Sequence, residues 1–275
     1  MYRKVYVEIT NVCNMHCSFC HGHHRELRRM KLDEFSLILD KLRGKTEYIY
    51  YHLMGEPLTH PELPAFLRLA KERGYKSIIT TNGTLTERCG EAILAAGVHK
   101  VNLSLHSFEE GDGEAHPRYV RALAGFAKRA AACGTIVVFR LWNKGCDDGK
   151  NDVALQILKE TLDGVWSEHA RGMKLCDNVY LEWGERFAWP DKDADVQGER
   201  FFCYGLKDQF GILADGTVVP CCLDSDGVIA LGNIFSEDVE SILGSVRAMA
   251  MVEGFRCGKA TEELCRRCGY AQRFV

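Results

Sequence analysis

The sequence predicts an α/β protein whose main part is a partial (βα)6 barrel of the TIM type, followed by a small cysteine-rich C-terminal domain. Three observations carry this prediction. Short β-branched or aromatic runs alternate six times with amphipathic segments, which indicates parallel strands joined by helical crossovers. The alternation occupies about 180 residues, whereas a complete eight-fold barrel takes about 250. Most of the 13 cysteines gather near the two ends of the chain.

Composition excludes several functional classes. The 275 residues carry 35 Lys and Arg against 38 Asp and Glu, so the net charge is −3 and no nucleic-acid partner is expected. The apolar fraction of 46% excludes a disordered chain. The N-terminal residues Met-Tyr-Arg-Lys-Val-Tyr-Val-Glu offer no signal-peptide core, and charges interrupt every apolar run before it reaches the roughly 18 residues of a membrane span. We expect a cytoplasmic protein without a membrane partner.

The hydrophobic periodicity places each element of the barrel. The expected strands are Val5–Ile9, Tyr48–Leu53, Lys76–Thr80, Lys100–Leu105, Thr135–Leu141 and Asn178–Glu182. The expected helices are Leu32–Leu42, Leu63–Lys71, Glu87–Ala96, Tyr119–Ala132 and Val153–Leu162. Pro61 and Pro64 mark the start of the second helix, and Gly97 ends the third.

The pattern changes after Pro190. Residues 191–200 are polar and predict a linker. Beyond it, Gln209–Leu213 and Thr217–Val219 flank an Ala-Asp-Gly turn and predict a hairpin, and one helix is expected over Val239–Val252. We therefore divide the chain into a barrel (1–190), a linker (191–202) and a cysteine-rich domain (203–275).

Three cysteines follow the first strand closely: Cys13, Cys17 and Cys20. The carboxyl ends of parallel barrel strands are where active sites are built. In a reducing compartment such thiols indicate metal or redox chemistry, although spacing of i, i+4 and i+7 also fits one buried helix face. Closed zinc sites and fully ligated [4Fe–4S] clusters take four ligands, so three thiolates would leave one iron of a cube open.

The Cys-x3-Cys-x2-Cys loop, with aromatic Phe19 before its last cysteine, resembles that of the radical S-adenosylmethionine (radical SAM) superfamily. The resemblance implies a [4Fe–4S] cluster on Cys13, Cys17 and Cys20 whose open iron binds the amino and carboxylate groups of SAM. An electron from the cluster would cleave SAM to methionine and a 5′-deoxyadenosyl radical. That radical would abstract a hydrogen atom from the substrate.

Two turns agree with this resemblance. Met54-Gly55-Glu56-Pro57 follows the second strand and is similar to the family's Gly-Gly-Glu-Pro motif, which implies that Gly55 and Glu56 hold the SAM amino group. Met54 departs from the usual first glycine, and we expect the backbone contacts to survive. Thr81-Asn82-Gly83 closes the third strand and is similar to the family turn near the SAM ribose, which implicates Asn82.

The fourth and fifth strands add three candidate residues. Ser104 and His106 alternate with leucines and are expected to point into the barrel. Arg140 sits among apolar residues, where a buried cation needs an anionic partner. The resemblance assigns Arg140 to the SAM carboxylate. It covers about residues 4–185.

The C-terminal cysteines resemble a second family feature. Cys203, twelve residues, Gly216, four residues and Cys221 look like the opening of the SPASM extension. Only seven residues follow the last cysteine, which favours the shorter "twitch" form with one auxiliary [4Fe–4S] cluster. The implied ligands are Cys203, Cys221, Cys265 and Cys268. A structural zinc site on the same four residues is the alternative, and Cys222 and Cys257 are spare thiols that could replace one ligand.

Two functional classes follow. The first is a radical SAM enzyme acting on an unknown small-molecule or peptide substrate, with the auxiliary cluster in electron transfer and an external electron donor such as flavodoxin or ferredoxin. The second is a non-catalytic zinc or Fe–S binding module. The basic segment from His21 to Arg29 either holds an anionic substrate or is a solvated loop.

Overall fold

The computed structural model describes residues 1–109, 114–170 and 172–274. Six parallel strands stand side by side in chain order and form the curved sheet that the sequence predicts. They are β1 (Lys4–Val7), β2 (Tyr48–Tyr50), β3 (Lys76–Thr81), β4 (Lys100–Ser104), β5 (Ile136–Leu141) and β8 (Val179–Trp183). The predicted partial barrel is thereby confirmed, with six parallel strands and five helices between them.

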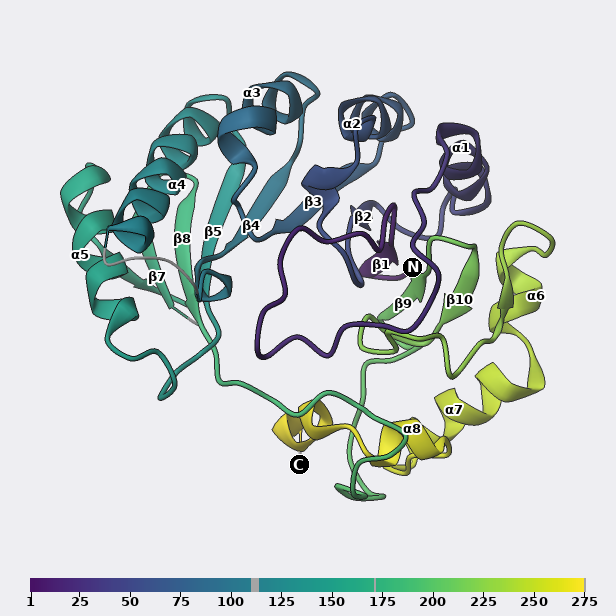
Figure 1. Cartoon of the computed structure of the whole chain (residues 1–275). Coiled ribbons are helices and arrows are strands. Elements are labelled where there is room, and N and C mark those ends of the chain that lie inside the picture. Colours follow the sequence, from purple (N-terminus) through teal and green to yellow (C-terminus); the bar gives the residue numbers. More distant parts are fainter. Residues whose placement is uncertain (110–113, 171, 275) are drawn as a thin grey trace.

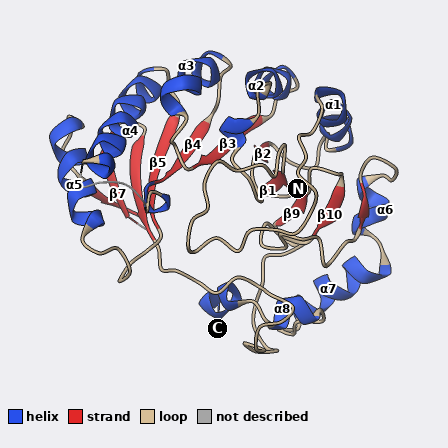
Figure 2. Ribbon diagram, in the orientation of Figure 1, coloured by secondary structure: helices blue, strands red, loops and turns tan. Residues whose placement is uncertain are grey.

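Five helices cover the outer face of this sheet (Figures 1 and 2). They are α1 (Leu32–Lys41), α2 (Leu63–Glu72), α3 (Thr86–Ala95), α4 (Ala115–Ala132) and α5 (Lys150–Thr161). Each presents one apolar stripe to the strands; on α1 the stripe is Phe35, Ile38 and Leu39, all buried. Of the described helices, even the 18-residue α4 lacks the apolar character needed to cross a bilayer.

The far edge of the sheet contains two strands that the periodicity did not predict. They are β6 (Ser167–His169) and β7 (Gly172–Cys176), which run antiparallel beside β8. All three residues of β6 are exposed, so the strand shows none of the apolar alternation on which the prediction relied.

The opposite edge is extended by the C-terminal part of the chain. Strand β9 (Gln209–Ile212) pairs in parallel with β1, with Phe210 opposite Val5. Strands β10 (Thr217–Val219) and β11 (Gly232–Asn233) follow it antiparallel. The predicted hairpin is present, and it belongs to the same 11-stranded sheet as the barrel strands.

The helices after the hairpin are shorter than expected. The single helix expected over Val239–Val252 is wrong, because the structure has α6 (Val239–Leu243) and α7 (Val246–Arg256). Ser245 separates them, and its side chain accepts a hydrogen bond from the backbone of Ala248 to cap α7. The short α8 (Glu263–Arg266) follows. In Figure 1 these elements lie across the ring from α3 and α4, and the purple segment between β1 and α1 loops into the ring.

Candidate functional site

The first three cysteines lie on the irregular segment between β1 and α1. Cys13 and Cys20 are exposed, and Cys17 is half-buried with its sulfur 3.5 Å from the carbonyl oxygen of Ser107. Burial, and then the nearby thiols of Cys20 and Cys13, raise the pKa of Cys17 to about 12. No helix contains these residues, so the buried helix face is excluded. The three free thiols are therefore neighbours on one open loop.

Polar contacts fix this loop over the carboxyl ends of β3 and β4. Asn82 Nδ2 donates to Asn14 Oδ1 at 3.0 Å, and Asn14 Nδ2 donates to Thr84 Oγ1 at 2.9 Å. Ser18 donates from its backbone and its hydroxyl to the Glu109 carboxylate, at 2.5 Å in both cases. Asn82, proposed from its turn motif, thus contacts the loop directly, whereas Glu109 was not foreseen.

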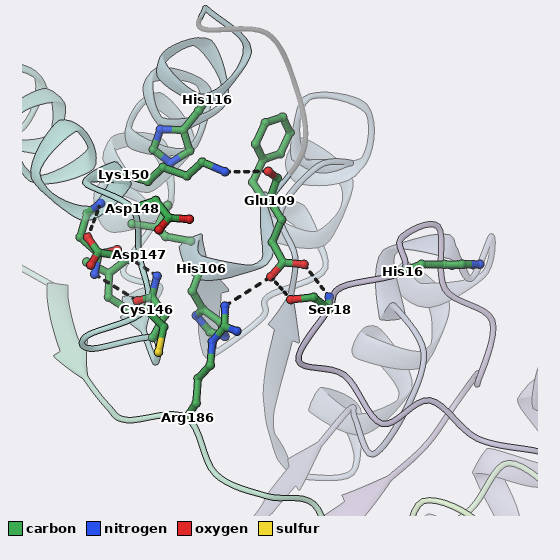
Figure 3. Close-up of a pocket in the computed structure, with 15 residues that line it drawn as sticks. His16, Ser18, His106, Glu109, His116, Cys146, Asp147, Asp148, Lys150 and Arg186 are labelled. Carbon is green, nitrogen blue, oxygen red and sulfur yellow. Dashed lines mark hydrogen bonds and ion pairs between the residues drawn. The ribbon is translucent and has the colours of Figure 1, made fainter.

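Glu109 also lines a cavity beside the loop. Arg186 lies 3.4 Å from its carboxylate, and Lys150 Nζ donates to its backbone carbonyl at 2.6 Å (Figure 3). The cavity measures about 550 Å³ and its lining includes His106, Ser18 and these charged groups. Its size is that of an ordinary small-ligand pocket.

The turn after β2 is held from both sides. Gly55 has φ +76°, and a Cβ there would overlap the backbone of Thr10 and Asn11, so glycine is required at this position. The buried Glu56 carboxylate accepts hydrogen bonds from Thr81 Oγ1 at 2.7 Å and from the Asn82 backbone at 2.7 Å.

A third hydrogen bond, 2.9 Å from the Leu58 backbone, also reaches the Glu56 carboxylate. Burial raises the pKa of Glu56 to about 6, against the lowering effect of these bonds. In the structure the side chain therefore ties the turn after β2 to the end of β3. A contact between Glu56 and a bound ammonium would add to a carboxylate that is already well satisfied.

His106 does not lie on a strand, which corrects its expected placement in the fourth strand, although its side chain lines the cavity beside the cysteine loop. Strand β4 ends at Ser104, whose carbonyl accepts a 2.6 Å hydrogen bond from Ser107 Oγ, and the chain turns into a short 3-10 helix (Leu105–Ser107). His106 Nδ1 lies 3.0 Å from the carbonyl oxygen of Arg140, and its ring lies 4.9 Å from that of Phe19. Burial lowers the pKa of His106 to about 4, so the imidazole is neutral at pH 7. His106 thus connects β5 to the cysteine loop.

Arg140 finds its anionic neighbour within the chain. Its Nε lies 3.6 Å from Glu182 Oε2, on the adjacent strand β8 and in register with it, and its guanidinium lies 5.0 Å from the Trp142 ring. Burial lowers the pKa of Arg140, while Glu182 opposes that shift. The buried Nε nevertheless makes no hydrogen bond. The guanidinium therefore retains capacity for a second anion.

The predicted auxiliary cysteines come together in the C-terminal region. Burial raises the pKa of Cys221 well above its usual value, and four neighbouring thiols raise it further: Cys222, Cys203, Cys265 and Cys268. All five are half-buried. Cys222 also hydrogen-bonds to Tyr6 on β1, whereas the exposed Cys257 thiol lies 3.4 Å from Glu253 on α7. Of the two spare thiols, Cys222 joins the group.

The donor chemistry of both cysteine groups is that of an iron–sulfur cluster. The irons of such clusters are held by cysteine thiolates, up to four for a [4Fe–4S] cube. Three free thiols lie together on the first loop, and five lie together in the C-terminal group. Zinc binds the same thiolates, so metal analysis decides which metal the C-terminal group holds.

The basic segment after the first cysteines links the two regions. The Arg25 guanidinium pairs with the fully buried Glu8 carboxylate through two bonds of 2.7 and 2.8 Å, and its Nε donates to Ser225 at 2.8 Å. His24 pairs with Asp226 at 2.9 Å. Arg25 is therefore neither a solvated residue nor a free cation for an anionic substrate, because its guanidinium pairs with Glu8. In the sequence, Glu8 is a carboxylate within the apolar run expected as the first strand, and a carboxylate there requires a cationic partner.

Comparison with known proteins agrees with both cysteine regions. Residues 7–142 match the family model described as the radical SAM superfamily, and residues 203–269 match the model of an iron–sulfur cluster-binding domain, SPASM. A GTP 3′,8-cyclase of Chlorobaculum tepidum is 35% identical over 109 residues, which is 38% of this chain and 33% of that protein.

A cofactor-modifying protein of the tungsten-containing aldehyde ferredoxin oxidoreductase of Pyrococcus furiosus is 37% identical over 108 residues, 38% of this chain and 30% of that protein. The chain spans about a third of the length of these curated relatives.

Solved structures share the fold over nearly the whole chain. BtrN in complex with AdoMet and 2-DOIA has a TM-score of 0.62 and 18% identity, covering 98% of this chain and 93% of that one. Streptococcus suis SuiB bound to its precursor peptide SuiA has a TM-score of 0.64 and 15% identity, covering 99% and 70%. With two family models matched in the order in which the cysteine groups occur, the chain belongs to the radical SAM superfamily and ends in a SPASM iron–sulfur domain.

Proposed function

We propose that the protein reductively cleaves S-adenosylmethionine and uses the resulting 5′-deoxyadenosyl radical to abstract a hydrogen atom from its substrate. One observation carries the proposal: three free thiols, Cys13, Cys17 and Cys20, lie on a single loop above the carboxyl ends of the barrel strands. Three thiolates on a [4Fe–4S] cube leave an iron for SAM, and that cluster would supply the electron.

The residues around the loop support a SAM site. The guanidinium of Arg140, with its unbonded Nε, suits the SAM carboxylate. Ser104 lies opposite Arg140 in register on β4, at the same level of the barrel. Gly55 and Glu56 shape the turn whose backbone would face the SAM amino group, and Asn82 orients the loop through Asn14.

The 550 Å³ cavity suits the nucleoside part of SAM. Leu105 and Leu141 offer apolar walls, and Asn143, Asn151 and neutral His106 offer hydrogen-bonding groups for a base and a ribose. The cavity adjoins the cysteine loop through Ser18, so a nucleoside bound there would lie beside the first cluster.

The C-terminal thiols Cys203, Cys221, Cys265 and Cys268 would ligate one auxiliary [4Fe–4S] cluster completely. Without an open iron, that cluster accepts an electron from the substrate radical rather than binding the substrate. The substrate is a small molecule or a peptide; the structural neighbours include proteins bound to each kind. A flavodoxin or ferredoxin in the cytoplasm would supply the first electron.

The test is anaerobic reconstitution followed by dithionite and SAM, with 5′-deoxyadenosine as the product measured. We expect 5′-deoxyadenosine to form in amounts that grow with time. Intact clusters without any cleavage would reject the enzyme and leave a metal-binding module. A matched sample of the Cys133→Ala variant, which removes an exposed thiol outside both groups, should behave as wild type.

A further inference from the structure

The segment between β8 and the C-terminal cysteines touches both cysteine groups. On one side, Trp189 Nε1 donates a 3.0 Å hydrogen bond to the carbonyl oxygen of Phe19, the residue before Cys20. The Trp189 ring lies 5.4 Å from the Phe187 ring. On the other side, the Phe187 ring lies 4.9 Å from the Tyr270 ring, centroid to centroid.

Tyr270 lies two residues after Cys268, so the contacts continue into the backbone of the second group. The path from Cys20 to Cys268 thus consists of covalent bonds, one hydrogen bond and two ring contacts, without a gap. We call Trp189, Phe187 and Tyr270 the aromatic bridge.

Further contacts join the aromatic bridge to the C-terminal segment. The Arg273 guanidinium lies over both rings, 5.3 Å from the Phe187 centroid and 4.9 Å from the Tyr270 centroid. Gly269 packs so closely on Ala188 that a Cβ at position 269 would come within 2.8 Å of the Ala188 side chain. These contacts hold the bridge segment against the C-terminal cysteine segment.

We propose that the aromatic bridge carries single electrons between the two cysteine groups, an inference that rests on the proposed function. One electron leaves the reduced auxiliary cluster, which returns to its oxidised state, and reduces the oxidised first cluster. No bond or proton moves in this step. The electron taken from the substrate radical would thereby return to the first cluster, which supplies the electron for SAM cleavage. Electronic coupling falls more slowly through packed rings and bonds than across a gap, which is the physical reason for the assignment.

The experiment compares electron redistribution in variants of the full holoenzyme. Each protein receives less than one reducing equivalent per chain, and freeze-quench EPR follows the exchange between the two cluster signals. Trp189→Leu and Phe187→Leu should slow the exchange by about tenfold or more. Tyr48→Leu is the matched control, because its ring contacts that of His99 beside the amino ends of β2 and β4, away from the bridge. It should exchange at the wild-type rate.

Two further measurements separate conduction from structure. Iron content and the inter-cluster distance from pulsed EPR should be unchanged in every variant. If the bridge residues only held the two regions apart, replacing them would change this distance; if they conduct electrons, replacing them changes the rate alone. Equal rates in wild type, Trp189→Leu and Phe187→Leu would overturn the proposal, as would equal slowing in Tyr48→Leu. If Trp189→Leu loses iron, the exchange rates of Trp189→Phe and Phe187→Leu test the proposal in its place. Absence of a second cluster in the wild type would overturn the electron path by removing one of its two ends, whereas failure of the proposed SAM cleavage is detected separately, by the absence of 5′-deoxyadenosine.

Discussion

The two cysteine regions are held in opposite ways. Cys13 and Cys20 are exposed on an irregular loop, and polar contacts from Asn82 and Glu109 position that loop. The C-terminal thiols are half-buried, and three of them pack against the hydrophobic core: Cys203, Cys265 and Cys268. One site is open and held by hydrogen bonds, while the other is enclosed and held by packing.

This difference matches two kinds of chemistry. Under the proposed function, a cluster held by three thiols on the exposed loop would leave room for an exchangeable ligand on the fourth iron. A cluster held by four half-buried thiols would have no open iron and would suit electron transfer, for which no ligand has to enter.

Removing the open site should abolish the chemistry. The wild type should bind about eight irons, two cubes of four, and Cys13→Ala, Cys17→Ala and Cys20→Ala together should leave about four. SAM cleavage should disappear because no open iron remains. Iron analysis and a 5′-deoxyadenosine assay measure both. A triple variant that keeps all its iron would show that the first cluster lies elsewhere.

Removing the enclosed site should have a split result. Cys265→Ala with Cys268→Ala should lose about four irons and turnover of the true substrate, yet retain uncoupled SAM cleavage. Iron and zinc are counted in the same sample. Cys257→Ala is the control and should keep its metal, because its thiol lies with Glu253 outside the group. One zinc per chain in the wild type would make this domain a structural clamp.

The buried ion pair between Arg25 and Glu8 should contribute strongly to the free energy of unfolding. Arg25→Ala leaves the buried Glu8 carboxylate without its cationic partner and with only the backbone N–H groups of Met54 and Ala214, which should lower the free energy of unfolding by about 3–5 kcal/mol. Anaerobic denaturant unfolding measures this change. The exposed Arg29 is the control, and Arg29→Ala should change stability by about 0.5 kcal/mol or less. Equal effects of the two would refute the role of the ion pair.

The smallest expected effects concern SAM affinity. Arg140→Ala removes the proposed carboxylate partner, and Glu56→Gln replaces an oxygen that accepts the Asn82 N–H with a donor. Each should weaken SAM binding about ten- to a hundred-fold, equivalent to roughly 1.5–3 kcal/mol, without changing the iron content. Equilibrium binding to reconstituted protein tests this, with the exposed Glu87→Gln as control. Unchanged affinity in both variants would move the SAM pocket elsewhere.

Local patterns in the sequence determined the barrel units and the first cysteine loop. The strand Lys76–Thr80 is observed as Lys76–Thr81, and the helix Leu32–Leu42 as Leu32–Lys41. Hydrophobic periodicity over ten residues contains enough information for such elements, because burial of one face requires it. Cysteine spacing was informative for a different local reason. Three thiols on one short loop are close in space, whatever the rest of the chain does.

Tertiary structure alone decided the features that join distant segments. Strand β9 pairs with β1 across some two hundred residues. The Arg25 guanidinium pairs with Glu8 and donates a hydrogen bond to the Ser225 carbonyl. Arg140 pairs with Glu182. His106 lies beyond the end of β4, in the turn where the Ser107 hydroxyl donates a hydrogen bond to the Ser104 carbonyl. None of these has a periodic signature, since each depends on which edges and side chains meet after the sheet has curved. The sequence by itself determined the units and the thiol chemistry, and only packing decided how the two cysteine sites are connected.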